Sequence, residues 1–192
     1  MAEKKDTEKD QPDNKVASKA LFESRTILFF GEMKQEVSKA LTEQLLAMAH
    51  VSDDPIKLII NSPGGHVESG DTIHDLIKFI KPDVKVIGTG CVASIASHIF
   101  FAPKLEDRLC LPNTRFLLHQ PSGGMMGQET DINIQAREIV RMKQRINNVI
   151  AEATGQDYDK VAKDTERDYW MSAEEAVAYG MVGRIVDNIG DV

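Results

Sequence analysis

The stretch IKLIINSPGG, residues 56–65, decides the fold of this chain. Its first five residues are apolar apart from one lysine, which predicts a buried strand, and the turn sequence NSPGG follows at once. Apolar residues between Ile73 and Ile80 then recur at helical spacing, so we expect a helix over 68–80. VKVIGTG (84–90) predicts the next strand. A strand, a turn, a helix and a second strand in this order predict a largely parallel sheet covered by helices.

The same alternation continues on both sides of this unit. Further strands are predicted at 25–31, 108–111, 115–119 and 184–186. Further helices are predicted at 36–50, 94–102, 131–153, 158–164 and after the capping box formed by Ser172 and Glu175. A loop is expected through Asp168. The chain is therefore expected to be an α/β protein, and its length of 192 residues suits one domain with extensions.

Charge and cysteine usage argue against several classes of function. The 30 acidic and 23 basic residues give a net charge of -7, which disfavours nucleic acid and anionic membranes as partners. The two cysteines, Cys91 and Cys110, have apolar neighbours and no metal-ligand spacing. We therefore expect reduced thiols in a reducing compartment, no metal site and no cofactor.

The N-terminal segment differs from the rest of the chain. Residues 1–19 hold five lysines, five acidic residues and no aromatic residue, a composition that cannot bury enough surface to fold. We expect a disordered charged tail there. No apolar stretch follows the first lysines, as a secretory signal would require, and no run reaches the length of a membrane span. The expected location is the cytoplasm.

Two short segments that follow strands contain residues suited to nucleophilic catalysis. The PGG turn (63–65) fits a type II turn, after which the bare N–H of Gly65 can point at an oxyanion. A tight turn without a chemical role is the other interpretation, and the commoner one for an isolated PGG. Ser94 opens a helix directly after a strand, where the helix dipole would stabilise a tetrahedral intermediate. Alternatively, Ser94 is an ordinary N-cap that accepts from the amides of Ala96 or Ser97.

A serine nucleophile requires a general base, and the chain has five histidines. His50 and His74 are expected in solvent, at a helix end and on a polar helix face. His98 lies one helical turn after Ser94, but nothing near it in the sequence would orient it. His119 ends an apolar strand on the side of the sheet where active-site loops gather. Its alternative role is that of an ordinary strand terminus.

The third member of such a site would be an acid that orients the imidazole. The polar segment DTERDYW (164–170) offers Asp164, Glu166 and Asp168. Each of these could equally be a solvated surface charge. Spacing alone does not choose among them.

Six segments of the chain resemble the proteolytic subunit of the Clp protease (the ClpP family), in the family's order and over about residues 20–188. They are INSPGG (60–65), FIKPDV (79–84), ASIAS (93–97), LCLPNTRFLLHQP (109–121), GQETDINIQAREI (127–139) and DTERDYWMSAEEAVAYGMV (164–182). The resemblance implies a ClpP/crotonase-like fold of repeated ββα units. Residues 20–192 would form one serine peptidase domain with a projecting handle at about 122–153.

The resemblance also implies roles for individual residues. Ser94 would be the nucleophile, His119 the general base and Asp168 the carboxylate that orients it. The N–H groups of Gly65 and Ile95 would form the oxyanion hole. The implied reaction is hydrolysis of peptide bonds through an acyl-enzyme.

The family's assembly is implied as well: a homo-oligomer of two stacked heptameric rings around a closed chamber that admits polypeptide substrates. A Clp-family ATPase unfoldase would deliver folded substrates, because the chain has no phosphate-binding loop of its own. Gly123 and Gly124 resemble the strand that binds substrate by β-augmentation. Glu166 and Arg167 match a pair that couples ring contact to alignment of the triad.

Several positions depart from the family pattern. The charged tail replaces the segment whose axial loops gate the pore. Lys57 and Ile59 stand where unfoldase-docking tyrosines are typical, whereas Phe79 and Ile87 are retained. A lysine in an apolar docking pocket would weaken insertion of a hydrophobic loop unless it extends outward. Near the nucleophile, Ala96 replaces the usual glycine and the bulkier His98 follows, which would reshape the specificity pocket.

Two alternative functions stay open at this point. One is a crotonase-like acyl-CoA enzyme, which would share the fold and a glycine oxyanion hole. The other is a structural ring member, or a paralogue that needs a sister ClpP subunit in a mixed ring, suggested by the altered rim and gate.

Overall fold

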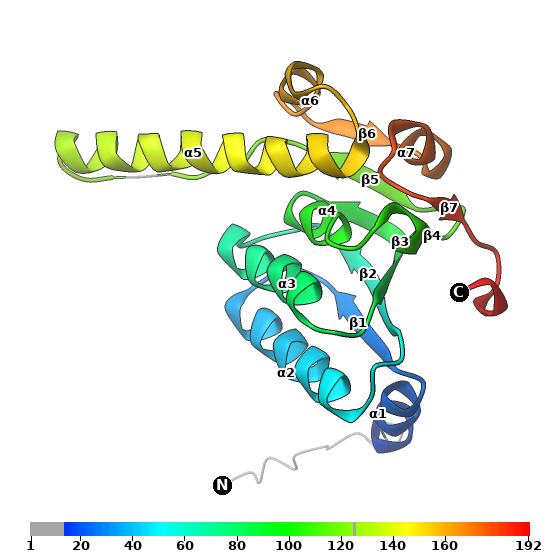
Figure 1. Cartoon of the computed structure of the whole chain (residues 1–192). Helices are drawn as coiled ribbons and strands as arrows, with labels where there is room; N and C mark the ends of the chain where they lie inside the picture. Colours follow the sequence, from blue (N-terminus) through cyan, green and yellow to red (C-terminus); the bar gives the residue numbers. More distant parts are fainter. Residues whose placement is uncertain (1–13, 125) are drawn as a thin grey trace, which may run out of the picture.

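A computed structural model of the chain describes residues 14–124 and 126–192 (Figure 1). The strands are β1 (Thr26–Phe30), β2 (Ile56–Ser62), β3 (Val84–Ala93), β4 (Arg108–Cys110), β5 (Arg115–Leu118), β6 (Tyr169–Met171) and β7 (Arg184–Ile185). The helices are α1 (Asn14–Glu23), α2 (Gln35–Val51), α3 (Val67–Phe79), α4 (Ile95–Phe100), α5 (Glu129–Thr154), α6 (Tyr158–Asp164) and α7 (Ala173–Tyr179), with short 3-10 turns at Leu105–Asp107 and Ile189–Asp191.

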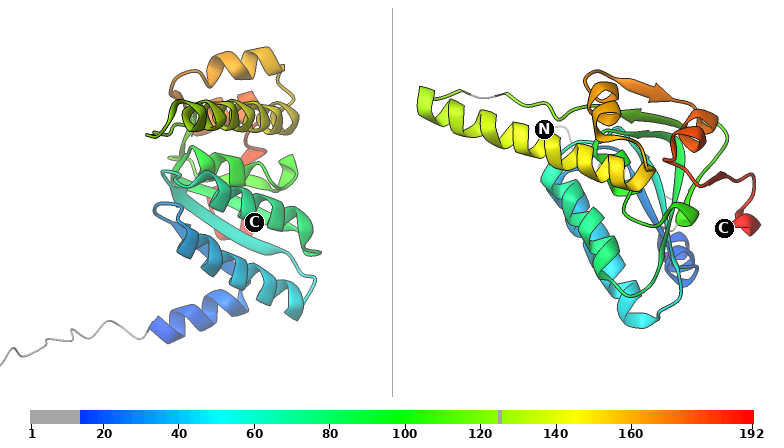
Figure 2. Two further views of the ribbon diagram at one scale, coloured as in Figure 1. Left: turned by 90° about the vertical axis from the view of Figure 1, so that its left-hand side faces the viewer. Right: turned by 45° about the horizontal axis from the view of Figure 1, so that its top comes forward.

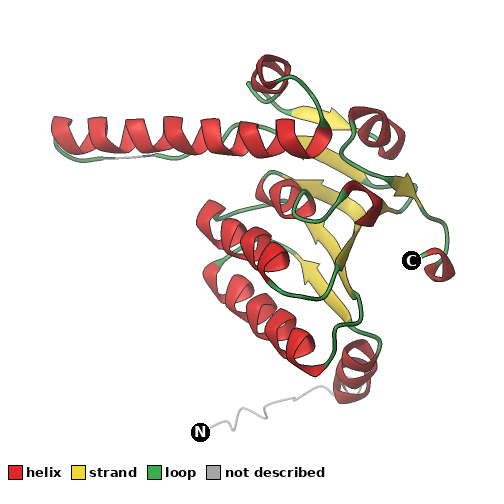
Figure 3. Cartoon of the chain, viewed as in Figure 1, coloured by secondary structure: helices red, strands yellow, loops and turns green. Residues whose placement is uncertain are grey.

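The strands form one largely parallel sheet in the order β1-β2-β3-β4-β7, and β5 and β6 extend it from β3. Helices α2 and α3 lie on one face of the sheet (Figures 1 and 3). Alternate residues of β2 follow this arrangement, because Ile56, Leu58 and Ile60 are fully buried whereas Lys57 and Ile59 between them are half-buried. The α/β class expected from the sequence is confirmed.

Strand β3 is shared between two neighbours. Its first half pairs with β4 at Val86–Gly88, and its second half pairs with β5 at Cys91–Ala93. Strand β5 in turn pairs with β6 in the antiparallel direction. The sheet therefore divides along β3, and the second half of β3 ends beside the end of β5.

Helix α5 has 26 residues and projects from the body of the molecule (Figures 1 and 2). Only its C-terminal part is buried, at Ile146, Asn147 and Ile150. Apolar side chains nearer its start, among them Ile132 and Val140, are exposed. The projecting helix expected from the sequence is confirmed, and its outer turns pack on no other helix or strand that the structure describes.

The structure differs from the sequence-based expectation at two places. Helix α1 begins at Asn14, so residues 14–19 of the expected disordered tail are helical, and residues 1–13 lie outside the described residues. The loop expected through Asp168 is present, but the strand β6 follows it directly; this strand was not predicted, because at three residues it is too short to show a period. Among the described helices, none combines the length and the apolar composition that crossing a membrane requires.

A buried arginine links the C-terminal elements to the sheet. The guanidinium of Arg108, on β4, donates hydrogen bonds to the carbonyls of Pro103 at 3.0 Å and Ala153 at 2.9 Å, and longer ones to Gly180 and Met181. Burial lowers the pKa of Arg108 to about 10, which still leaves it charged at neutral pH. One cation thus ties β4 to the end of α5 and to the turn after α7.

We expect the substitution Arg108→Met to lower the free energy of unfolding by about 2–4 kcal/mol, because it leaves several buried carbonyls without a donor. Urea denaturation followed by far-UV circular dichroism measures this. The control is Arg115→Met, because Arg115 is exposed and its guanidinium stacks on the Trp170 ring at 4.4 Å. The control substitution is expected to lower the free energy of unfolding by about 1 kcal/mol or less. Equal losses in the two variants would contradict the role given to Arg108.

Candidate active site

The pairing of β3 with β5 brings Ser94 and His119 together. Ala93 pairs with Leu117 in parallel register, so both strands end at the same edge of the sheet. Ser94 directly follows Ala93, and His119 follows β5. The backbone N–H of Ser94 donates to the carbonyl of Leu117 at 3.0 Å, which closes this contact.

The pairing of β5 with β6 adds Asp168. Leu118 pairs with Tyr169 in antiparallel register. The next residue along β5 is His119, and the preceding residue on the other strand is Asp168, so the two face each other across the ladder. Beyond this pair, the backbone N–H of Gln120 donates to the carbonyl of Thr165 at 2.8 Å and extends the link between the two segments.

The three side chains form a continuous hydrogen-bonded chain. The Oγ atom of Ser94 lies 2.8 Å from Nε2 of His119, and Nδ1 of His119 lies 2.9 Å from Oδ1 of Asp168. The carboxylate can only accept, so Nδ1 carries the proton and Nε2 is the acceptor that faces the serine hydroxyl. The side chain of His119 is 30% exposed and that of Asp168 is 63% exposed. The site is therefore open to solvent on the Asp168 side.

Ser94 has the backbone conformation of a strained turn between a strand and a helix. Its φ of 58° and ψ of -125° are rare for a residue with a side chain. No cap bond forms from its side chain, so the interpretation of Ser94 as an ordinary N-cap is wrong. Ser97, one turn on, is buried, and its hydroxyl donates to the carbonyls of Val92 and Leu117, both at 3.0 Å. This bridge holds the turn against β5.

The PGG turn lies against Ser94. Gly64 has φ +95°, as the second corner of a type II turn requires, and a Cβ there would sit 2.6 Å from Cβ of Ser94 and 2.8 Å from the carbonyl of Ala93. Only glycine fits this approach. Within residues 14–124 and 126–192, the backbone N–H groups of Gly65 and Ile95 donate no hydrogen bond. The two consecutive glycines predicted a turn from the sequence alone. The contact of this turn with Ser94 could not be predicted, because it depends on how the two segments pack in the fold.

Two of the other histidines differ from the sequence-based expectation. His74, expected in solvent, is buried, and its ring stacks on that of His98 with centroids 4.4 Å apart. His98, expected to have no orienting group, has Nε2 3.1 Å from Oδ1 of Asp71. The polar neighbours of His74 along α3 suggested an exposed face, but α4 and its His98 cover that position. His50 is exposed, as expected.

The remaining candidate residues lie around this site and on the open face of the sheet. Gly123 and Gly124 are exposed, in the extended segment that leads to α5. Glu166 pairs with Lys143 of α5 at 2.7 Å, and this bond lowers the pKa of its carboxyl group. Arg167, beside it, is exposed.

The four docking candidates are not equally accessible. Lys57 and Ile59 are half-buried on the open face of β2, and Phe79 is exposed at the end of α3. Ile87 is buried, in a small cluster against which Ile59 and Val192 pack. In the part of the chain that the structure describes, no three histidine, cysteine, aspartate or glutamate side chains gather where they could hold a metal ion.

Comparisons with known proteins agree with this geometry. The family model described as Clp protease matches residues 8–189. The ATP-dependent Clp protease proteolytic subunit 3 of Rhizobium meliloti is 58% identical over 181 residues, which cover 94% of this chain and 93% of that protein. The proteolytic subunit 2 of Pseudomonas aeruginosa is 53% identical over 162 residues, which cover 84% and 81%.

A solved structure shows the same fold. ClpP1 from Listeria monocytogenes superposes with a TM-score of 0.83 at 50% identity, and the match covers 91% of this chain and 98% of that one. The similarity thus extends over nearly the whole polypeptide, including the strand ends that carry Ser94, His119 and Asp168. The chain belongs to the Clp protease family.

Proposed function

We propose that the chain is a serine-type endopeptidase that cleaves peptide bonds through an acyl-enzyme. The observation that carries this proposal is the pair of hydrogen bonds from Ser94 to His119, at 2.8 Å, and from His119 to Asp168, at 2.9 Å. A serine is a weak nucleophile until a neighbouring base accepts its proton, and an imidazole can do so at neutral pH.

The geometry supports a two-step reaction. Oγ of Ser94 attacks the carbonyl carbon of the scissile bond while its proton moves to Nε2 of His119. Asp168 stabilises the imidazolium that forms. The tetrahedral intermediate collapses, the C–N bond breaks, and the leaving amine takes the proton from His119. A water molecule then gives a proton to His119 and attacks the ester carbonyl. The second tetrahedral intermediate collapses, the C–Oγ bond breaks, and His119 returns the proton to Oγ of Ser94.

The oxyanion of the intermediate needs donors, and we assign these to the backbone N–H groups of Gly65 and Ile95. Both are without a hydrogen-bond partner among the described residues. The PGG turn supports the assignment, because Gly64 holds its backbone against Ser94 and the N–H of Ile95. Each donor of this kind typically contributes about 10²–10³ in rate.

Substrate would bind as an extended strand along Gly123 and Gly124, whose exposed backbone lies in the segment between the triad and α5. Main-chain hydrogen bonds of this kind do not distinguish between substrate side chains, so selectivity for particular residues has to come from pockets that receive those side chains. The apolar side chains exposed on α5, Ile132, Ile134 and Val140, suit burial against other copies of the chain.

We further propose that copies assemble into two stacked heptameric rings, in which α5 contacts the facing ring. We assign to Glu166 and Arg167 the role of linking that contact to the triad. The pairing of Glu166 with Lys143 of α5, two residues from Asp168, supports this assignment. The relatives are named subunits of an ATP-dependent protease. A separate Clp-family ATPase would deliver substrates and dock at Lys57, Ile59, Phe79 and Ile87.

The alternatives considered from the sequence are not favoured. A crotonase-like enzyme needs no Ser–His–Asp chain, and the comparisons identify the Clp protease family instead. A purely structural ring subunit would have no use for the strained Ser94 and its hydrogen-bonded base. Partnership with a sister subunit in mixed rings is compatible with an active triad.

The substitution Ser94→Ala is expected to abolish peptide hydrolysis and to leave the assembly intact, because it removes only the nucleophilic oxygen. Turnover of short fluorogenic peptides measures the activity, and native mass spectrometry measures the assembly. In the unmodified protein, a fluorophosphonate probe should label Ser94, as tryptic mass mapping would show. Undiminished turnover in the variant would refute the assignment.

The substitution Gly64→Ala is expected to lower kcat/KM by about 10²-fold or more, since a Cβ at this position collides with Ser94 and disturbs the turn that presents the Gly65 amide. Gly31→Ala is the matched control. Gly31 also has a positive φ, +85°, but a Cβ there would meet nothing within 4 Å. The control should lose some stability and keep its activity within a few-fold. Similar activity losses in both would attribute the effect to backbone strain alone.

A further inference from the structure

A narrow pocket opens beside Ser94, on the side of the helix α4. Its walls are mostly apolar, from Val67, Ile95, Phe101, Leu118, Ile146 and Ile150. Apart from Ser94 and His119, which belong to the triad, its one lining residue with a polar side chain is His98. A pocket next to a nucleophile receives the side chain that precedes the scissile bond, so His98 is placed to contact that side chain.

The ring of His98 is held in position by its surroundings. The side chain is 3% exposed and stacks on the buried ring of His74, with centroids 4.4 Å apart. Its Nε2 atom lies 3.1 Å from Oδ1 of Asp71, close enough for electrostatic attraction although the alignment falls short of a full hydrogen bond. His74 and Asp71 both belong to α3, so contacts from this neighbouring helix fix the orientation of the His98 ring.

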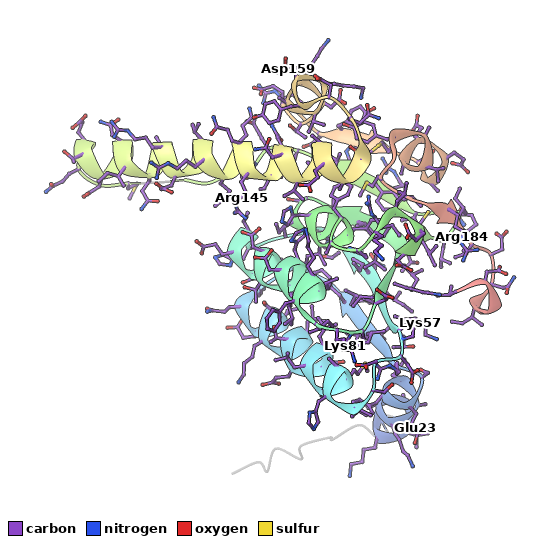
Figure 4. The ribbon with its side chains drawn as sticks, viewed as in Figure 1. Glu23, Lys57, Lys81, Arg145, Asp159 and Arg184 are labelled. Carbon is purple, nitrogen blue, oxygen red and sulfur yellow. The ribbon has the colours of Figure 1, made fainter. Side chains whose placement is uncertain are left out.

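Asp71 is ionised, and its charge decides which nitrogen of the His98 ring carries the hydrogen. Burial alone would raise the pKa of this carboxyl group, but the contacts from His98 and Arg145 outweigh burial and lower it to about 2. Arg145 reaches down from α5 (Figure 4) and places Nη2 2.7 Å from Oδ2 of Asp71. The carboxylate attracts the protonated nitrogen of the imidazole, so Nε2 carries the hydrogen. In the neutral ring, Nδ1 is then an acceptor.

That acceptor has no partner. Nδ1 of His98 is fully buried and makes no hydrogen bond with any residue that the structure describes. Buried polar atoms are nearly always paired, since an unpaired one has lost its bond to water without replacement. An unpaired acceptor on a ring that lines a substrate pocket indicates that the partner is supplied by the substrate.

We propose that His98 determines specificity at this pocket by accepting a hydrogen bond, through Nδ1, from the side chain that precedes the scissile bond. The enzyme then favours compact side chains that carry an O–H or N–H donor, such as threonine and asparagine. It disfavours apolar side chains of the same shape, such as valine and leucine. This inference rests on the proposed peptidase function and adds the class of substrate to it.

The test uses tripeptide aminocoumarin substrates, in which the dye fixes the residue that enters the pocket. Two near-isosteric pairs, threonine against valine and asparagine against leucine, are compared on the assembled protein. We expect kcat/KM to be about tenfold higher for the donor-bearing member of each pair, since one hydrogen bond to an otherwise unpaired group is worth about that factor.

Two variants test whether His98 causes this preference, which is expressed as the ratio of kcat/KM for the donor-bearing substrate to kcat/KM for its apolar counterpart. His98→Phe keeps an aromatic ring against His74 but has no acceptor, so this ratio is expected to fall to one or below. His74→Phe is the matched control, because it changes the same stacked pair at a residue that does not line the pocket. It should keep the ratio of the unmodified protein. Each ratio is taken within one variant and is therefore independent of how much of that variant assembles.

Equal turnover of both members of each pair by the unmodified protein would overturn the proposal, and this measurement needs no substitution. An unchanged ratio in His98→Phe would overturn it too. A ratio lost equally in His74→Phe would assign the effect to packing of the two rings and likewise overturn it. Absence of turnover for all four substrates, together with absence of fluorophosphonate labelling at Ser94, would instead refute the peptidase function itself.

Discussion

The site depends on one constraint, the pairing of β5 on both of its edges. Its parallel ladder with β3 sets His119 beside Ser94, and its antiparallel ladder with β6 sets His119 opposite Asp168. A slip of one residue in either ladder would displace a side chain by about 3.3 Å and turn it to the other face of the sheet. The hydrogen bond from Ser94 to His119, or the one from His119 to Asp168, would then be lost. Three residues that are distant in the sequence are thus positioned by backbone register, before any side chain contributes.

The strain at Ser94 is confined to a turn that several polar contacts hold in place. The positive φ points the hydroxyl out of the strand toward His119, a direction that a regular strand or helix would not provide. The backbone bond from Ser94 to Leu117 and the two bonds from Ser97 fix this turn from one side. Gly64 approaches from the other side, where no Cβ would fit. Stability in the surrounding sheet is what allows the strained residue to persist.

Much of this arrangement was predictable from the sequence, and the failures have physical causes. The periodicity identified the longer elements. The motifs offered Ser94 and His119 among several candidates, the family resemblance chose these two and Asp168, and the structure brings the three side chains together. The sequence did not reveal the strand β6, which is too short to show a period. It also missed the cluster of Asp71, His74 and His98, because its members come from α3 and α4 and their counter-ion comes from α5. Contacts between elements depend on packing, which local patterns do not encode.

The outer turns of α5 have a consequence for how the molecule behaves in solution. An isolated helical segment of this length is marginally stable in water, and these turns pack on no other helix or strand that the structure describes. Their helix–coil equilibrium is therefore coupled to association: whatever covers Ile132, Ile134 and Val140 also orders the backbone that carries them. The helical fraction of this segment therefore rises with the concentration of subunits, and dilution would unfold it much as a denaturant does.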